Sequence, residues 1–284
     1  MKNIFTIVTI SLLIATFSFT SAQAQSKEIQ QDALSASVNG KVLYANANKG
    51  NVHIARPKSN DPLISGAAEP VSLQMNDQGW SELPSSVVSE ANATEIDLSG
   101  NFLESLPEAI GNWQRCERFS ARNNRLAALP ESISRWTSLR MLDLTKNQLE
   151  SLPAGLGAMQ SLVSVTLDLN YLSTLPAQLC QLTRLQELSI RFNSISSLPA
   201  SVGMMKSVKR LYLTNNRLTT LPEEIGSMSH LEMLMLDNND IRTLPASISN
   251  LKDTLTLLSL KGNPLTDVNM EELRKLLPNT MIEF

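Results

Sequence analysis

Residues that commonly build chemical sites are scarce in this chain of 284 residues, which contains two histidines and two cysteines. So few argue against a metal cage, a disulfide framework and a histidine-based catalytic centre. Positive charge is not in excess, because 24 lysine and arginine residues face 27 acidic residues and leave a formal net charge of -3. This balance excludes the basic surface typical of nucleic-acid-binding proteins. Since no phosphate-binding glycine loop occurs either, we expect no cofactor and no metal.

Long apolar runs are also scarce, and the one that occurs extends from Ile4 to Phe19. It follows Lys2 and precedes a small-x-small sequence that ends at Ala24, which is the pattern of a secretory signal peptide. A transmembrane helix is the alternative, but this run is shorter than the ~20 apolar residues that span a bilayer. We therefore expect residues 1–24 to be removed and the mature chain, which has no second apolar span, to be exported.

The rest of the chain contains a repeat. Eight of the 13 prolines follow a leucine and lie 23 residues apart. These are Pro84, Pro107, Pro130, Pro153, Pro176, Pro199, Pro222 and Pro245. Asparagines keep the same step from Asn101 to Asn239, and Asn263 follows after a one-residue insertion. Because 42% of the residues are hydrophobic, the repeat has enough apolar material to form a folded core.

Each unit follows the pattern LxxLxLxxNxLxxLPxxIxxLxx, and we number its 23 positions from the first apolar residue. Units in register begin at Ala93, Cys116, Leu139, Leu162, Leu185, Val208, Leu231 and Leu255. This pattern resembles the leucine-rich repeat family, in its 23-residue class with an LPxxI half. The resemblance implies eight repeats over residues 93–265.

The pattern predicts an α/β solenoid. Positions four and six alternate with polar neighbours, as in a half-buried strand, so successive units stack their strands into one parallel sheet. The LPxxIxxL half places apolar residues on one face of a short helical turn, with proline at its first position. Strands pack more closely than helices, so the sheet should line the concave face and the turns the convex face. The repeated asparagine should satisfy backbone groups where the chain leaves each strand.

The ends of the repeat array are atypical, as the ends of a solenoid must be. Residues 70–92 retain the apolar positions of a degenerate N-terminal capping repeat. Residues 266–284 predict a C-terminal cap, in which Asn269 caps a helix and a short strand ends the chain. Residues 25–69 form a polar leader without sustained periodicity, apart from a possible hairpin of residues 41–44 with residues 51–54.

Residues that look chemically active fall on structural positions of the repeat. Cys116 and Cys180 replace small or apolar residues and lie nearly three units apart, too far for a disulfide. The three tryptophans, Trp80, Trp113 and Trp136, also occupy repeat positions, so we expect them in the core. Neither histidine has a nucleophile or carboxylate at a recognisable motif spacing, although a catalytic site can assemble across a fold.

Positions three, five, seven and eight are free to vary on the concave face. The partner-binding candidates there are Leu169, Arg191, Phe192, Arg210, Tyr212, Met233 and Met235, with Arg118, Arg122 and Asp143 as a second set. Aromatic, methionine and arginine side chains are enriched in protein interfaces. The alternative for the charges is that they pair sideways, as Arg210 would with Glu187, and stabilise the fold only weakly.

The resemblance implies a function in protein binding, although a fold alone never proves a function. Animal extracellular relatives often carry cysteine-rich caps, and their absence here favours an exported bacterial protein, periplasmic or secreted. We expect a non-enzymatic module that binds a partner protein through its concave face. A structural or envelope-associated solenoid, a glycan-binding surface and, least favoured, an enzyme are the alternatives.

Overall fold

The computed structural model describes residues 34–38, 41–46, 51–54 and 71–284 of the chain. The chain divides into two compact units, Met1–Ser65 and Gly66–Phe284. The expected signal peptide, and the leader outside the strands described next, lie outside the described residues.

The described part of the first unit is an antiparallel sheet of three strands, β1 (Leu34–Val38), β2 (Lys41–Asn46) and β3 (Asn51–Ile54), in that order. The pairing of β2 with β3 is the hairpin that the sequence indicated. Strand β1 was not expected, so the leader holds more regular structure than predicted. Its sequence LSASV alternates small apolar and polar residues over five positions, a signal too short to stand out.

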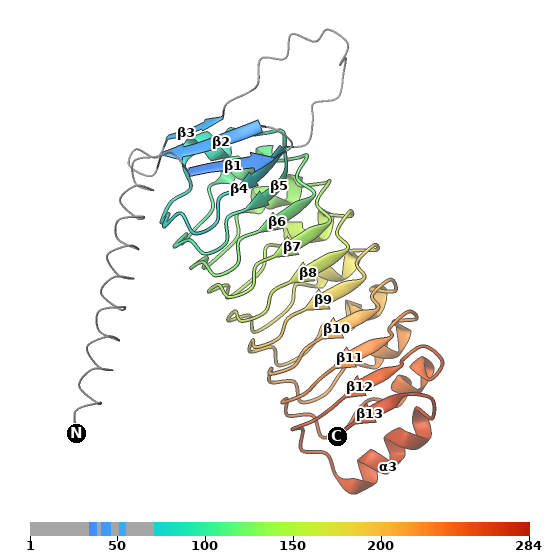
Figure 1. Cartoon of the computed structure of the whole chain (residues 1–284). Helices are drawn as coiled ribbons and strands as arrows, with labels where there is room; N and C mark the ends of the chain where they lie inside the picture. Colours follow the sequence, from blue (N-terminus) through green and yellow to red (C-terminus); the bar gives the residue numbers. More distant parts are fainter. Residues whose placement is uncertain (1–33, 39–40, 47–50, 55–70) are drawn as a thin grey trace, which may run out of the picture. The chain divides into compact units, whose positions relative to one another are not determined.

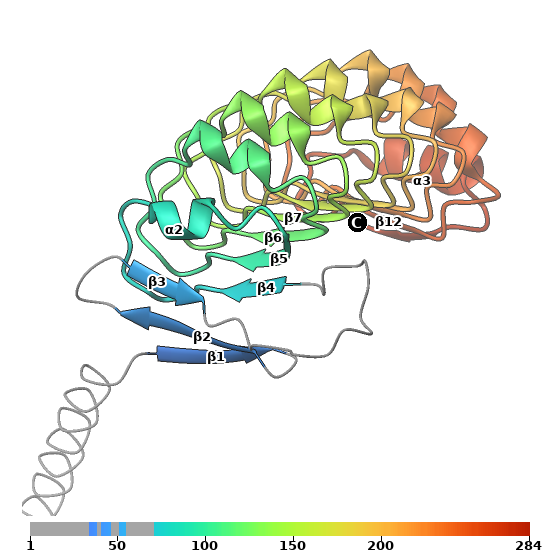
Figure 2. The same ribbon diagram turned by 90° about the horizontal axis from the view of Figure 1, so that it is seen from above.

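The second unit is a single parallel sheet of ten strands, in which each strand pairs with the next along the chain (Figure 1). The strands are β4 (Val71–Gln74), β5 (Ala93–Asp97), β6 (Arg118–Ser120), β7 (Met141–Asp143), β8 (Ser164–Thr166), β9 (Glu187–Ser189), β10 (Arg210–Tyr212), β11 (Met233–Met235), β12 (Leu257–Ser259) and β13 (Met281–Glu283). The sheet is open and curved, with short helical turns on its outer side (Figure 2). The predicted solenoid is therefore confirmed.

The convex side is built from one short helical element in each coil. These are α2 (Ser85–Val88), η1 (Glu108–Asn112), η2 (Glu131–Arg135), η3 (Ala154–Ala158), η4 (Ala177–Gln181), η5 (Ala200–Met204), η6 (Glu223–Ser227) and η7 (Ala246–Leu251), and all except α2 are 3-10 helices. The sequence predicted proline at the first position of each turn. In the structure, the proline lies just before the turn. Pro107, for example, is extended, and its carbonyl accepts the N–H of Ile110 (3.0 Å), which closes the tight turn.

Strand register places the same repeat position of successive units side by side. Arg118 pairs with Met141, and Met141 pairs with Ser164, so these steps along the sheet equal 23 residues, whereas the last two steps, from β11 to β12 and from β12 to β13, equal 24. Leu142 and Leu144 are 1% and 0% exposed, which confirms that positions four and six face the core. Side chains at positions three and five therefore form outward columns along the concave face.

The aromatic part of the core lies in the first coils. Trp113, Phe119 and Trp136 are buried, with ring centroids 4.8 to 6.2 Å apart. Trp80 is only half-buried, because the degenerate first coil has no complete neighbour before it within the second unit. The prediction of three core tryptophans therefore holds for two of them.

The repeated asparagine ties neighbouring coils together. Asn147 Nδ2 donates to the carbonyls of Ala121 (2.9 Å) and Leu144 (3.0 Å), and its Oδ1 accepts the N–H of Leu126 (3.1 Å). The same pattern recurs at Asn124 and Asn170. These side chains satisfy buried backbone groups at the turn after each strand, as the sequence predicted.

The C-terminal cap is a helix, α3 (Asp267–Leu276), followed by β13. Thr266 is its N-cap and forms a capping box with Asn269 at the third helical position. The expectation that Asn269 itself caps the helix is therefore wrong by three residues; threonine is also a good N-cap residue. Leu273 and Leu277 are buried beneath the helix.

Candidate partner-binding surface

Charged side chains on the concave face pair sideways along the sheet. The pairs are Glu95 with Arg118 (3.8 Å), Arg122 with Asp143 (3.6 Å), Asp168 with Arg191 (2.8 Å) and Glu187 with Arg210 (2.7 Å). Hydrogen bonding to Glu187 is the main cause that raises the pKa of the Arg210 guanidinium, so this side chain stays charged. The pairs of Glu95, Asp143 and Glu187 are exposed or half-buried on both sides, and such pairs stabilise a fold by less than about 1 kcal/mol each. These charged side chains thus pair with one another within the sheet. The apolar candidates are the ones that remain without such partners on this surface.

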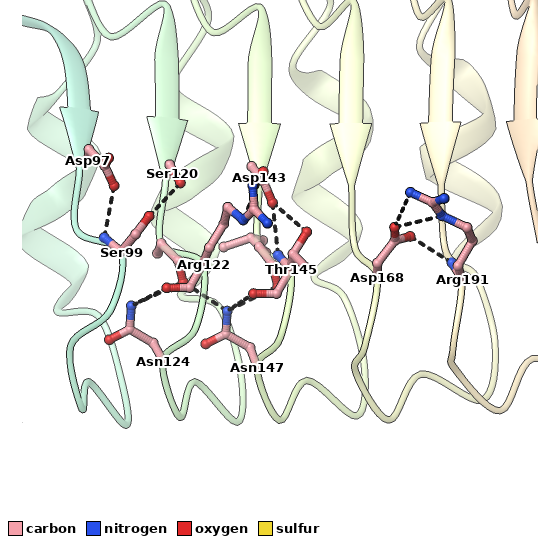
Figure 3. A network of polar contacts seen from close by, with 12 residues as sticks. Asp97, Ser99, Ser120, Arg122, Asn124, Asp143, Thr145, Asn147, Asp168 and Arg191 are labelled. Carbon is pink, nitrogen blue, oxygen red and sulfur yellow. Dashed lines mark hydrogen bonds and ion pairs between the residues drawn. The ribbon is translucent and has the colours of Figure 1, made fainter. Parts of the chain in front are cut away.

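Asp168 is the most buried carboxylate among these pairs. It is 6% exposed and accepts a hydrogen bond from the Ser189 hydroxyl (2.6 Å). It also accepts hydrogen bonds from the Arg191 N–H (2.7 Å) and Arg191 Nε (2.9 Å) (Figure 3). The guanidinium carbon of Arg191 also lies 5.3 Å from the centroid of the Tyr212 ring. Arg191 is therefore held in place on both sides and supports the ring of Tyr212.

Four of the candidates share one patch of strand surface, which we call the strand cluster: Arg210, Tyr212, Met233 and Met235. Strands β10 and β11 set Arg210 beside Met233 and Tyr212 beside Met235. All four are half-buried, because each is flanked by the next column of side chains. Three of the four side chains, those of Tyr212, Met233 and Met235, are largely apolar, and Arg210 is paired with Glu187.

Leu169 and Phe192 lie elsewhere, in the turns that follow β8 and β9. They are 46% and 50% exposed, which is unusual for side chains so large. With Tyr171, which is 62% exposed, they form what we call the turn cluster. The turns of Leu169 and Phe192 are one coil apart, so their side chains stand about one strand spacing, ~5 Å, from each other along the edge.

Tyr171 was missed because only positions three, five, seven and eight were considered on the sequence. It occupies position ten, immediately beyond Asn170, and position ten is polar in most other coils. The other aromatic residue at position ten is Phe102, which is also exposed but has the guanidinium of Arg125 over its ring at 4.8 Å. An exposed aromatic residue at a normally polar position is the signal that could have found Tyr171.

Position eight has a left-handed backbone in every coil from β4 to β12. The residues there are Asp77, Gly100, Asn123, Lys146, Leu169, Phe192, Asn215, Asn238 and Gly262, with φ between 52° and 71°. Glycine, asparagine and aspartate adopt this conformation readily, whereas a larger side chain costs roughly 1–2 kcal/mol. Leu169 and Phe192, with φ of 56° and 55°, are therefore strained there, as is Lys146 with φ of 60°, but only Leu169 and Phe192 are also apolar.

The second set of candidates lies near the other end of the sheet. Arg118 and Asp143 line a shallow hollow of about 240 Å³ on the strand face, together with Glu95 and Met141. Arg122 lies just beyond β6, in the ion pair with Asp143. Since Asp143 also accepts hydrogen bonds from the N–H (3.0 Å) and hydroxyl (2.7 Å) of Thr145, these charges are engaged within the fold (Figure 3).

The two cysteines are free thiols in the core, as expected. Burial is the main cause that raises the pKa of Cys116 to about 12, so its thiolate is not available as a nucleophile near neutral pH. Within residues 71–284 and the described leader strands, no cluster of three or more potential ligand side chains could hold a metal ion. None of the helices in the described part of the chain is long and apolar enough to cross a bilayer.

Comparison with known families agrees with this geometry. A model described as Leucine rich repeat matches residues 137–195, 183–241 and 206–265, and a second model of that description matches residues 92–113. Together the matches cover more than half of the chain. The chain belongs to the leucine-rich repeat family. This fold is typical of protein–protein interaction and generally serves as a non-enzymatic recognition scaffold.

Solved leucine-rich repeat structures show the same architecture. The leucine-rich repeat domain of the type III effector XopL is 25% identical, with a TM-score of 0.62 over 72% of this chain and 72% of that one. A TDR receptor is 24% identical over 76% of this chain and 43% of its own, with a TM-score of 0.54. A Leptospira interrogans leucine-rich repeat protein is 25% identical over 72% of this chain and 75% of its own, but its TM-score of 0.31 is too low to indicate a shared arrangement. The search of curated proteins finds no match.

Proposed function

We propose that this leucine-rich repeat protein binds a partner protein through the turn cluster and the adjoining strand cluster. The observation that carries the proposal is that Leu169 and Phe192 are large, apolar and exposed at positions with a left-handed backbone. The fold is less stable for having them there. Strain that is kept at a surface without compensating packing is typical of functional sites.

The chemistry of the surface favours a protein as the partner. The turn cluster provides leucine, phenylalanine and tyrosine side chains at one edge, and the strand cluster provides Met233, Met235 and Tyr212, whose ring is supported by Arg191. Aromatic, methionine and arginine residues dominate the binding energy of protein interfaces. Because the nearby charges are already paired, the main driving force should be apolar burial.

We propose, further, that the protein is exported after removal of residues 1–24 and acts in the periplasm or outside the cell as a bacterial recognition module of the 23-residue class. The N-terminal sequence pattern supports this proposal. Mass spectrometry of the N-terminal peptide in periplasmic and secreted fractions tests it. A chain that keeps Met1 and stays in the cytoplasm would contradict it.

The binding proposal is tested by affinity capture with the mature chain, followed by direct titration of the captured partner. The double variant Leu169→Asn/Phe192→Asn should lose the partner, with a dissociation constant raised about 100-fold or more, since interface anchors are worth about 2 kcal/mol or more. Met204→Asn is the matched control, because Met204 is an exposed apolar residue on the convex side. A partner retained equally by all three proteins would place the binding surface elsewhere, or indicate a purely structural solenoid.

A further inference from the structure

A polar groove lies at the opposite edge of the sheet, where the strands begin. Its volume is about 530 Å³, within the range of small-ligand sites. The residues that shape it belong to positions 23 and two of consecutive coils and include Ser138, Arg140, Ser161, Val163 and Arg184. The turn cluster follows the ends of the strands, so the groove and the turn cluster are separate surfaces.

The groove lies where small side chains occur beside longer ones at repeat positions two and 23. At position two, Val163 lies between Arg140 and Gln186, and at position 23 Ser161 precedes Arg184. Val163 donates its N–H to the Arg140 carbonyl (2.8 Å) and accepts that of Gln186 (2.9 Å), so the three coils are directly adjacent. The backbones of the two outer coils are therefore about 10 Å apart, with Ser161 and Val163 as the half-buried floor.

The two arginines differ from those of the concave face in having no ionic partner. Within residues 71–284, neither the Arg140 nor the Arg184 side chain forms a hydrogen bond or ion pair, whereas Arg191 and Arg210 are each bound to a carboxylate. Glu117 is the one carboxylate that lines the groove, and it belongs to the coil before Arg140. The groove therefore carries a net positive charge, with two exposed guanidinium groups at its walls.

We propose that this groove binds an oxyanion, the carboxylate or phosphate group of a polar ligand, between Arg140 and Arg184. A guanidinium offers a planar fork of donors that matches either group. An anion above Ser161 can be reached from both sides, since each arginine side chain extends over half the gap. The hydroxyl of Ser161 can donate a further hydrogen bond from the lining, whereas the Thr183 hydroxyl already donates to Gln160 Oε1 (3.2 Å).

Titration calorimetry at low salt with two anionic probes, inorganic phosphate and trigalacturonate, tests this proposal, with maltotriose as the uncharged comparison. We expect saturable binding of one molecule of at least one anionic probe and none of maltotriose. Binding of phosphate alone assigns a phosphate-bearing ligand, and binding of trigalacturonate alone assigns a carboxylated one. Failure of both anionic probes to saturate would overturn the proposal.

Variants locate the site. Arg140→Gln and Arg184→Gln should each weaken binding about tenfold or more, since each loses a charge-assisted pair of hydrogen bonds. Arg217→Gln is the matched control, because Arg217 is exposed at position ten, on the edge with the turn cluster. Equal weakening by Arg217→Gln would show a non-specific charge effect, and unchanged binding by both groove variants would show that the anion binds elsewhere; either result overturns the proposal. Circular dichroism verifies the fold, which substitutions at these exposed positions should leave intact.

Discussion

The turns at Leu169 and Phe192 and those at Asn215 and Asn238 have the same backbone but opposite side-chain chemistry. All four residues have φ between 53° and 57°, and each turn is held by the asparagine that follows. Asparagine suits this conformation, whereas leucine and phenylalanine do not. The difference shows which coils are optimised for stability alone and which carry large apolar side chains at a cost.

The largest expected effect comes from the asparagine that the two kinds of turn share. Asn170→Ala removes hydrogen bonds to the carbonyls of Leu144 (3.0 Å) and Leu167 (3.0 Å) and from the N–H of Leu149 (3.0 Å). Burying these groups unpaired should lower the free energy of unfolding by about 2–4 kcal/mol, as measured by urea denaturation.

Asn216→Ala should cost the same amount, because Asn216 makes equivalent hydrogen bonds in a turn that has asparagine at position eight. Ser173→Ala is the control, since Ser173 is exposed in the same coil as Asn170. If the two asparagine variants differed by more than about 1 kcal/mol, the hydrogen bonds of the two turns would not contribute equally to stability.

Replacing asparagine by a large apolar residue at position eight of another coil should lower the stability of the protein. Asn215→Phe places a large side chain on a left-handed backbone and should destabilise the protein by roughly 1–2 kcal/mol. Arg217→Phe, at the exposed position ten of the same turn, has no such backbone and should change stability by less than about 0.5 kcal/mol. Equal effects of the two substitutions on the midpoint of unfolding would rule out backbone strain as the cause.

Leu169→Asn should have a smaller and opposite effect. Asparagine tolerates the left-handed backbone of position 169 better than leucine does. The substitution should therefore stabilise the fold by about 1 kcal/mol, despite the loss of a half-exposed apolar side chain. Thermal unfolding measured against Leu169→Ala separates the two contributions, because alanine keeps the strain. If Leu169→Asn were no more stable than Leu169→Ala, backbone strain at position 169 would not explain the effect.

The smallest change in stability is expected at Tyr171, which is exposed without a left-handed backbone. Tyr171→Ser should change the free energy of unfolding by less than about 0.5 kcal/mol, as at most surface positions. It should nevertheless weaken partner binding if the turn cluster acts as one surface. This variant therefore distinguishes the contribution of an exposed side chain to partner binding from the effect of backbone strain on stability.

The sequence predicted the fold well because a 23-residue period constrains every coil in the same way. Burial of Leu142 and Leu144 and the bonding of Asn147 follow directly from that period. Local capping was predicted less well: proline precedes each 3-10 turn, and Thr266 caps α3, because neighbouring residues compete for a cap within one turn.

The candidate surface was only partly predictable. Periodicity identified Leu169, Phe192 and the strand cluster as outward-facing, but it does not report backbone dihedral angles. Gly100, Asn123 and Asn215 at position eight were the available sign that the backbone there is left-handed. Ion pairing depends on side-chain geometry, so only the structure shows that the candidate arginines are already engaged.

The most direct test of the central claim is to measure stability and partner binding together on the double variant Leu169→Asn/Phe192→Asn. Asparagine tolerates the left-handed backbone at both positions, so the double variant should have a free energy of unfolding about 2 kcal/mol higher than the parent. Partner binding should be lost at the same time. A double variant that is less stable than the parent would show that these side chains serve the fold, and one that is more stable but still binds the partner would show that they do not serve recognition.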